Sequence, residues 1–117
     1  SMLFICYPKC STCKKAKKWL DEHHLNYTER HIVEEKPSYD ELKEWVSKSG
    51  LPLKKFFNTS GLLYKEMKLK DKLPTMSEDE QLQLLATNGM LVKRPLVIGD
   101  EAILVGFKDN EWSEKLE

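Results

Sequence analysis

Apolar and polar positions in the first third of the chain predict a strand, a helix and a second strand. Residues 2–7 form a short run of apolar, β-forming side chains that ends at Pro8, which indicates a buried strand. Residues 11–24 place apolar side chains at helical spacing along one face and lysines on the others. Residues 26–33 alternate loosely, and we expect them to form a strand parallel to the first one.

The rest of the chain predicts several helices, then a β-hairpin and a last helix. Ser38 and Ser77 each precede a glutamate by three positions, a capping box that marks a helix start. Residues 52–73 are less regular and indicate shorter helical pieces. The apolar runs 96–98 and 102–105 flank a turn and indicate a hairpin, and a charged amphipathic segment closes the chain. This order predicts an α/β fold with a mixed four-stranded sheet flanked by helices.

Length and charge narrow the class of protein further. At 117 residues, the chain suits one domain with a single packed core. Its 19 basic and 19 acidic side chains cancel, so bulk charge gives no reason to expect direct binding to nucleic acid or to a membrane. No apolar run approaches the roughly 20 residues of a membrane span, and the first residues lack the pattern of a signal peptide. We therefore expect a cytoplasmic protein.

All three cysteines, Cys6, Cys10 and Cys13, fall within the first 13 residues. In a reducing compartment such a cluster is more often catalytic or metal-binding than structural. Cys10-Ser11-Thr12-Cys13 is a CxxC motif at the predicted strand-to-helix junction, where unpaired N–H groups and the helix dipole favour a thiolate. We expect Cys10 to attack, and Cys13, one turn further on the inward face, to resolve the mixed disulfide. The motif predicts thiol–disulfide chemistry.

Other uses of the same cysteines stay open on the sequence alone. Free cysteines are often small core residues. The Cys6-x3-Cys10-x2-Cys13 spacing matches that of an iron–sulfur cluster in radical enzymes, but the chain is too short for the barrel that those enzymes need. A zinc site would recruit some of the three histidines, although the sequence has no second CxxC and no CxxC…HxxxH spacing. We expect neither a metal nor a cofactor.

Lys93-Arg94-Pro95 precedes a predicted strand and is a second candidate feature of the site. In a thioredoxin-like fold a proline at this place is commonly cis and packs beside the CxxC motif. Arg94 would then project a fixed cation towards the Cys10 thiolate or an anionic substrate. The alternative is that Pro95 only starts the strand and that Arg94 is solvated.

Several motifs together resemble those of the ArsC/Spx family: Tyr7-x-x-Cys10-Ser11-Thr12-Cys13-Lys14-Lys15-Ala16, then Lys93-Arg94-Pro95-Leu96, then Gly106-Phe107-Lys108-x-x-x-Trp112. The resemblance implies a thioredoxin/glutaredoxin-like fold with a helical insertion between the second and third strands. Residues 1–117 would form one such domain, and residues 38–89 would be the insertion. It also implies Cys10 as the nucleophile and Arg94 as the anion-binding residue before a cis Pro95. Thr12 and the backbone amides after Cys10 would line the anion pocket.

The sequence departs from this family at two of the three arginines that bind the oxyanion in its arsenate reductases. The chain has only two arginines, Arg30 and Arg94, and Ser60 and Lys108 stand near the places where the others are expected. We therefore expect a thiol–disulfide redox protein with weak or no activity on arsenate. Its reductant would be a thiol donor such as glutathione, glutaredoxin or thioredoxin. The alternative is an Spx-like redox-sensing regulator that binds RNA polymerase, since CxxC is typical of that branch.

Overall fold

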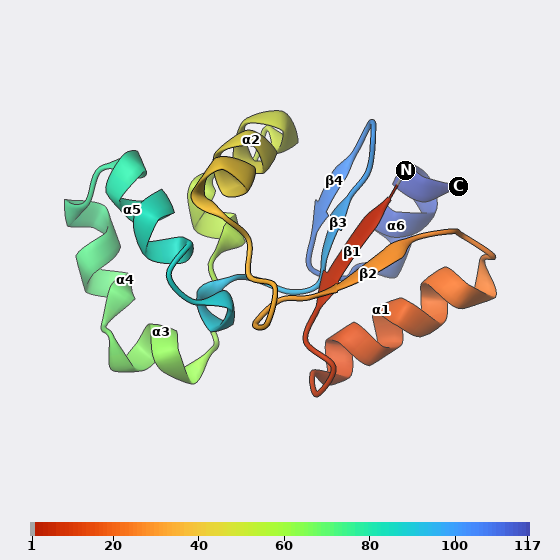
Figure 1. The fold of residues 1–117 in the computed structure, drawn as a ribbon, viewed down its shortest axis with the longest axis horizontal. Coiled ribbons are helices and arrows are strands. Elements are labelled where there is room, and N and C mark those ends of the chain that lie inside the picture. Colours follow the sequence, from red (N-terminus) through yellow and green to blue (C-terminus); the bar gives the residue numbers. More distant parts are fainter. Residues whose placement is uncertain (1) are drawn as a thin grey trace.

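A computed structural model describes residues 2–117 and shows a four-stranded mixed sheet with helices around it (Figure 1). The strands are β1 (Leu3–Cys6), β2 (Thr28–His31), β3 (Leu96–Ile98) and β4 (Ile103–Val105), and they lie in the order β2-β1-β3-β4. β1 and β2 are parallel, whereas β3 is antiparallel to both of its neighbours, β1 and β4. The predicted fold class, the parallel opening unit and the closing hairpin are confirmed.

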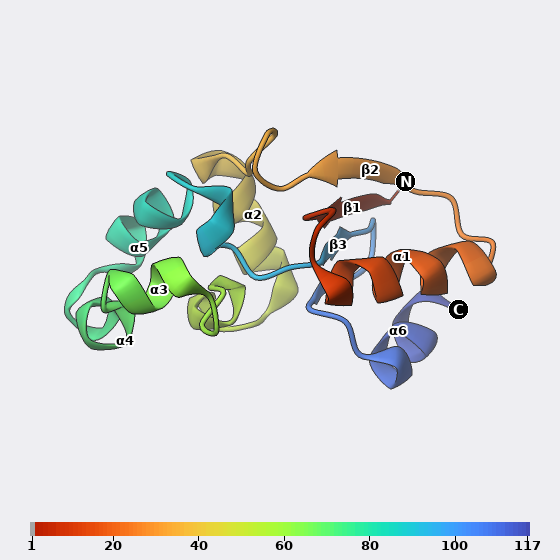
Figure 2. The same ribbon diagram turned by 90° about the horizontal axis from the view of Figure 1, so that it is seen from below.

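One face of the sheet is covered by α1 (Ser11–Glu22) and α6 (Asp109–Leu116), which lie on the same side of it in Figure 2. Side chains alternate along a strand, so Phe4 and Cys6 of β1 share this face. They pack with Trp112 of α6 and with the inner face of α1. The apolar spacing predicted that inner face, whose buried side chains are Cys13, Ala16, Trp19 and Leu20.

The opposite face of the sheet carries Ile5 and Leu96, which pack against the residues between β2 and β3. This stretch contains α2 (Tyr39–Ser49), α3 (Leu62–Glu66), α4 (Leu69–Lys72) and α5 (Glu78–Leu85), joined by short 3₁₀ turns over Leu53–Phe56, Leu73–Thr75 and Gly89–Leu91. In Figure 1 these helices form a lobe beside the sheet. They are the helical insertion expected between the second and third strands.

Both helix starts predicted from capping boxes are confirmed. The Ser38 hydroxyl accepts a hydrogen bond from the Glu41 backbone N–H at 3.1 Å, and the Glu41 carboxylate accepts one from the Ser38 N–H at 3.0 Å. The same exchange joins Ser77 and Glu80 at the start of α5. Each box satisfies two N–H groups that the first turn of a helix leaves without a partner.

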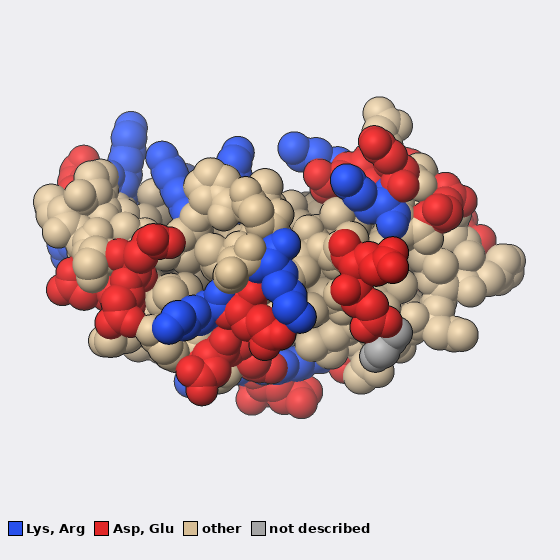
Figure 3. Space-filling model, turned by 90° about the horizontal axis from the view of Figure 1, so that it is seen from above, with Lys and Arg blue, Asp and Glu red and all other residues tan. Residues whose placement is uncertain are grey.

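The surface shows no simple separation of charge on the face drawn in Figure 3, where acidic and basic side chains are intermixed. This fits the balance of 19 basic and 19 acidic residues. Within residues 2–117, no helix has the length and apolar character needed to cross a membrane.

Candidate functional site

A tight turn between β1 and α1 carries Cys10. The Cys10 N–H donates to the Tyr7 carbonyl at 2.9 Å, which closes the turn. Cys10 is the N-cap residue of α1, with an extended backbone (φ −85°, ψ 125°). It is partly exposed, whereas Cys6 and Cys13 are buried. The expected position of Cys10 at a helix N-terminus, and the expected order of exposure, are confirmed.

Cys13 lies one helical turn further on, against the end of β1. The Tyr7 backbone N–H donates to the Cys13 sulfur at 3.3 Å, and Cys13 packs with Cys6 and Cys10 in one cluster. The hydrogen bond to Cys6 and burial raise the pKa of Cys13 well above that of a free thiol, against the smaller opposing effects of Tyr7 and Cys10. Cys13 is therefore held in its protonated form at neutral pH.

Cys6 lies in the same buried cluster as Cys13. The hydrogen bond from the Cys13 thiol lowers the pKa of Cys6, although burial and the nearby Glu29 carboxylate oppose this shift. The Cys6 sulfur lies 3.6 Å from Glu29 Oε2, and Lys17 Nζ lies 2.8 Å from the other oxygen of that carboxylate. A polar chain thus leads from the buried cysteines through Glu29 to the surface.

Segments far apart in the sequence are joined next to Cys10. Phe57 and Val92 form an isolated antiparallel bridge, and the Lys93 N–H donates to the Phe56 carbonyl at 2.8 Å. This pairing places the turn at residues 58–61 beside Lys93. The Gly106 N–H donates to the Pro95 carbonyl at 2.8 Å and so brings the end of β4 to the same place.

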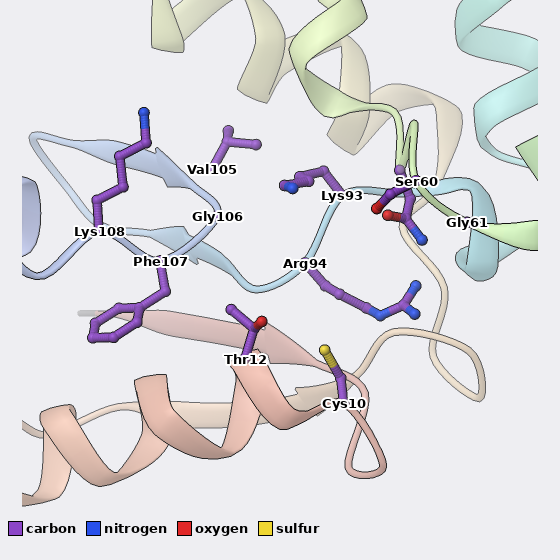
Figure 4. Close-up of a pocket in the computed structure, with 11 residues that line it drawn as sticks. Cys10, Thr12, Ser60, Gly61, Lys93, Arg94, Val105, Gly106, Phe107 and Lys108 are labelled. Atoms are coloured by element: carbon purple, nitrogen blue, oxygen red, sulfur yellow. The ribbon is translucent and has the colours of Figure 1, made fainter.

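The result is a pocket of about 320 Å³ that opens in front of Cys10 (Figure 4). Cys10, Thr12 and Arg94, three of the expected site residues, line it together. Ser60 and Lys108, which stand near the expected family arginines, also line it. The remaining lining residues are Asn58, Gly61, Lys93, Val105, Gly106 and Phe107. Pro95 is buried behind the pocket rather than part of its lining.

Arg94 is held with unused donors beside this pocket. The Arg94–Pro95 peptide bond is cis, as predicted. The Arg94 guanidinium carbon lies 5.3 Å from the centre of the Tyr7 ring, a cation–π contact. Its Nε and Nη1 atoms are buried and have no hydrogen-bond partner among residues 2–117. Arg94 is thus partly buried rather than fully solvated, and two of its donors have no partner among these residues.

The other arginine, Arg30, is engaged elsewhere. Its guanidinium makes a two-point contact with the Glu41 carboxylate, at 2.7 Å and 2.8 Å. It also donates to the backbone carbonyls of Glu35 and Lys36. Arg30 does not line the pocket, and these four bonds use the donors that a substrate anion would need.

The side chains of His23 and His31 make contacts with groups other than the cysteine sulfurs. His23 stacks on Trp19 with ring centres 3.8 Å apart, and His31 Nδ1 accepts two backbone N–H groups at the end of β2. In the part of the chain that the structure describes, no three histidine, cysteine or acidic side chains are grouped so that they could hold a metal ion.

This fold and this arrangement of cysteines define a thioredoxin-like α/β protein with a CxxC pair at the start of its first helix. The chain belongs to the ArsC family, whose profile matches residues 6–115. The resemblance seen in the motifs is thus confirmed over almost the whole chain.

Individual relatives support the same assignment. The chain is 59% identical over 114 residues to YusI of Bacillus subtilis, covering 97% of each protein. It matches the crystal structure of an ArsC family related protein from Bacteroides fragilis with a TM-score of 0.94 and 62% identity, over 97% of this chain and 95% of that one. It is also 30% identical to the global transcriptional regulator Spx of Staphylococcus epidermidis, over 89% of this chain and 78% of that protein.

Proposed function

We propose that this protein is a thiol–disulfide redox protein that cycles Cys10 and Cys13 between dithiol and disulfide, with weak or no activity on arsenate. The observation that carries the proposal is the pairing of a partly exposed Cys10, at a helix N-terminus beside a pocket, with a buried Cys13 packed one helical turn behind it. Both thiols would be kept reduced in the cytoplasm, which is where we place the protein.

The proposed reaction has two exchanges. The Cys10 thiolate attacks one sulfur of a disulfide substrate, so a mixed disulfide forms and the first substrate thiolate leaves. Cys13 then loses its proton and attacks the Cys10 sulfur, which forms the Cys10–Cys13 disulfide and releases the second thiolate. Two electrons have passed from the protein to the substrate. A thiol donor such as glutathione, glutaredoxin or thioredoxin reverses both exchanges and restores the dithiol.

Arg94 and Thr12 would bind an anionic part of the substrate or of the thiol donor. Arg94 lines the pocket together with Cys10, and two of its buried N–H donors have no partner among residues 2–117. Such charge-assisted hydrogen bonds are the strong ones in protein recognition. The backbone N–H groups that open α1 add donors at the same place.

Turnover of a glutathione mixed disulfide, followed through a coupled glutathione reductase, tests the proposal. C10S should abolish turnover, because the exposed nucleophile is gone. C13S should instead accumulate the mixed disulfide on Cys10, which a mass increase of the intact protein detects. A C10S variant that turns over at the wild-type rate would remove Cys10 from the chemistry.

The second candidate is a redox-sensing regulator, and the relationship to Spx favours it. In this role the Cys10–Cys13 disulfide would change a surface that binds RNA polymerase. A pull-down of RNA polymerase with oxidised protein, with reduced protein and with C10S separates the two candidates. Capture that depends on oxidation and is lost in C10S supports the regulator, and no capture by any form excludes it.

A further inference from the structure

The most informative feature that the proposed cycle leaves unused is Cys6. The Cys13 sulfur lies 3.3 Å from the Tyr7 nitrogen, which is bonded directly to the carbonyl carbon of Cys6. It is therefore no more than about 6 Å from the Cys6 Cα, because two bonds separate that atom from the nitrogen. The two side chains also belong to the same buried cluster.

This contact follows from the fold. Cys6 is the last residue of β1 and points to the face that α1 covers, together with Phe4. Cys13 is on the buried side of α1, in the first turn above the end of that strand. A disulfide requires an S–S separation of about 2.05 Å and Cβ atoms about 3.5–4.5 Å apart, so a rotation of the two packed side chains would have to bring the sulfurs together.

We propose that Cys6 is a second resolving thiol, which takes over the disulfide from the Cys10–Cys13 pair and forms an inner Cys6–Cys13 disulfide. This step rests on the proposed Cys10–Cys13 cycle. The Cys6 sulfur attacks the Cys13 sulfur, the bond between Cys13 and Cys10 breaks, and Cys10 leaves as a thiolate. One disulfide is present before and after, so no oxidant or reductant is consumed.

The Glu29 carboxylate is the acceptor for the proton that Cys6 releases. The Cys6 thiol donates to Glu29 Oε2 at 3.6 Å, so the proton can pass to this carboxylate as the new S–S bond forms. Glu29 is exposed and passes the proton on to water. Lys17 holds the other carboxylate oxygen at 2.8 Å and keeps the group in place. Glu29 is thus a positioning residue for Cys6.

The transfer changes which thiol the oxidised protein presents. In a Cys10–Cys13 disulfide both pocket thiols are blocked. In a Cys6–Cys13 disulfide the bond joins two residues with 3% and 2% of their surface exposed, and Cys10 is free again at the pocket. The oxidised protein can then form a further mixed disulfide on Cys10 while it keeps its internal disulfide.

The sequence allows a direct test by peptide mapping. Trypsin cleaves after Lys9 and after Lys14, so Cys6 falls in peptide 1–9, and Cys10 and Cys13 fall together in peptide 10–14. Wild-type protein is oxidised with oxidised glutathione, alkylated with iodoacetamide under denaturing conditions, and digested without reduction. We expect the two peptides to be joined, with the alkyl label on Cys10.

Two variants complete the test. C6S, whose hydroxyl can still donate to Glu29, should keep only the internal disulfide of peptide 10–14 and lose the label on Cys10; its melting temperature checks that it folds. E29Q keeps all three thiols and should form the joined peptides several-fold more slowly, and E29D should recover much of the rate. An unchanged rate in E29Q would exclude Glu29 as the proton acceptor.

The outcomes separate this inference from the proposed function. An internal disulfide in peptide 10–14 of both wild type and C6S, with Cys6 fully alkylated in the wild type, would overturn the transfer and leave the Cys10–Cys13 cycle standing. Absence of that internal disulfide from both proteins, with no joined peptides, would overturn the cycle itself. Joined peptides that carry the label on Cys13 would show a Cys6–Cys10 bond and contradict the route.

Discussion

Restoring arginines at Ser60 and Lys108 should turn this protein into a better arsenate-binding protein. Both positions line the pocket together with Cys10 and Arg94. Arg30 cannot compensate for the missing arginines, because Glu41 and two backbone carbonyls use its donors. Arsenate is a dianion near neutral pH and is repelled by a thiolate, so its binding depends on the number of converging cations and N–H donors.

The expected gain can be worked from the pocket. A hydrogen bond to a charged group is worth about 1.5–3 kcal/mol, and the low end applies here because Ser60 and Lys108 are exposed to solvent screening. About 1.5 kcal/mol corresponds to roughly tenfold in affinity, so S60R should give roughly a tenfold gain, and S60R with K108R a gain between about tenfold and a hundredfold. K108R should contribute the smaller part, because lysine already supplies a charge there.

Steady-state arsenate reduction with a thioredoxin or glutaredoxin donor system measures the gain as kcat/KM. T59R is a matched control, since Thr59 neighbours Ser60 but is not part of the pocket lining. It adds the same charge without the pocket contact, and we expect no more than a small gain. Equal gains from T59R and S60R would show that net charge alone is responsible. A wild-type efficiency equal to that of three-arginine family members would refute the reasoning from the start.

Three further predictions concern the thiols and the Arg30–Glu41 pair. Iodoacetamide should label Cys10 first in the folded, reduced protein, because Cys6 and Cys13 are buried and should react only on unfolding. Peptide mapping of a time course measures the order of labelling. Early labelling of Cys13 would contradict its burial. Because the pKa of Cys13 is raised, mainly by its hydrogen bond to Cys6, the release of the second substrate thiol in a stopped-flow experiment should quicken about tenfold per pH unit through the neutral range. The hydrogen bonds from Arg30 lower the pKa of Glu41 from 4.5 to about 2, so this pair stabilises the fold above pH 4.5 and loses its contribution as pH falls towards 2. The Glu41 side chain is 36% exposed, so we expect the pair to contribute about 1–2 kcal/mol to the free energy of unfolding after solvent screening. The difference in urea unfolding between wild type and E41Q measures this contribution. A difference that does not shrink in acid would exclude the pair as its source.

The parts of the fold that the sequence predicted are those with local signals. The capping boxes at Ser38 and Ser77 operate within four residues of chain, and the strand patterns operate within a single run. Residues 52–73 gave only an outline, because α3 and α4 have five and four residues and are too short for a helical period to show. Burial of Tyr64 and Leu69 in the insertion stabilises these helices, and such packing leaves no local pattern.

The site residues also fall into those that a local motif predicted and those that only the fold brings together. Cys10 and Arg94 were predicted, because each belongs to a short motif with a known neighbourhood. Asn58 was not predicted as a lining residue, since the bridge between residues 57 and 92 brings its turn to the pocket. The contact of Cys6 with Cys13 depends on how α1 is rotated above β1, and alternation along the strand could have shown only that Cys6 faces the helix.

The two candidate functions make opposite demands on Cys13. Rapid turnover requires a resolving thiol that ionises readily, whereas a sensor benefits from an oxidised state that persists. The raised pKa of Cys13 slows its attack on a mixed disulfide at neutral pH, and its burial shields the disulfide that it forms. Both properties limit the rate of a catalytic cycle and lengthen the life of the oxidised protein. The rate at which thioredoxin or glutathione reduces the oxidised protein therefore decides between the two candidate functions. Reduction that is faster than substrate turnover supports the enzyme, and much slower reduction supports the sensor.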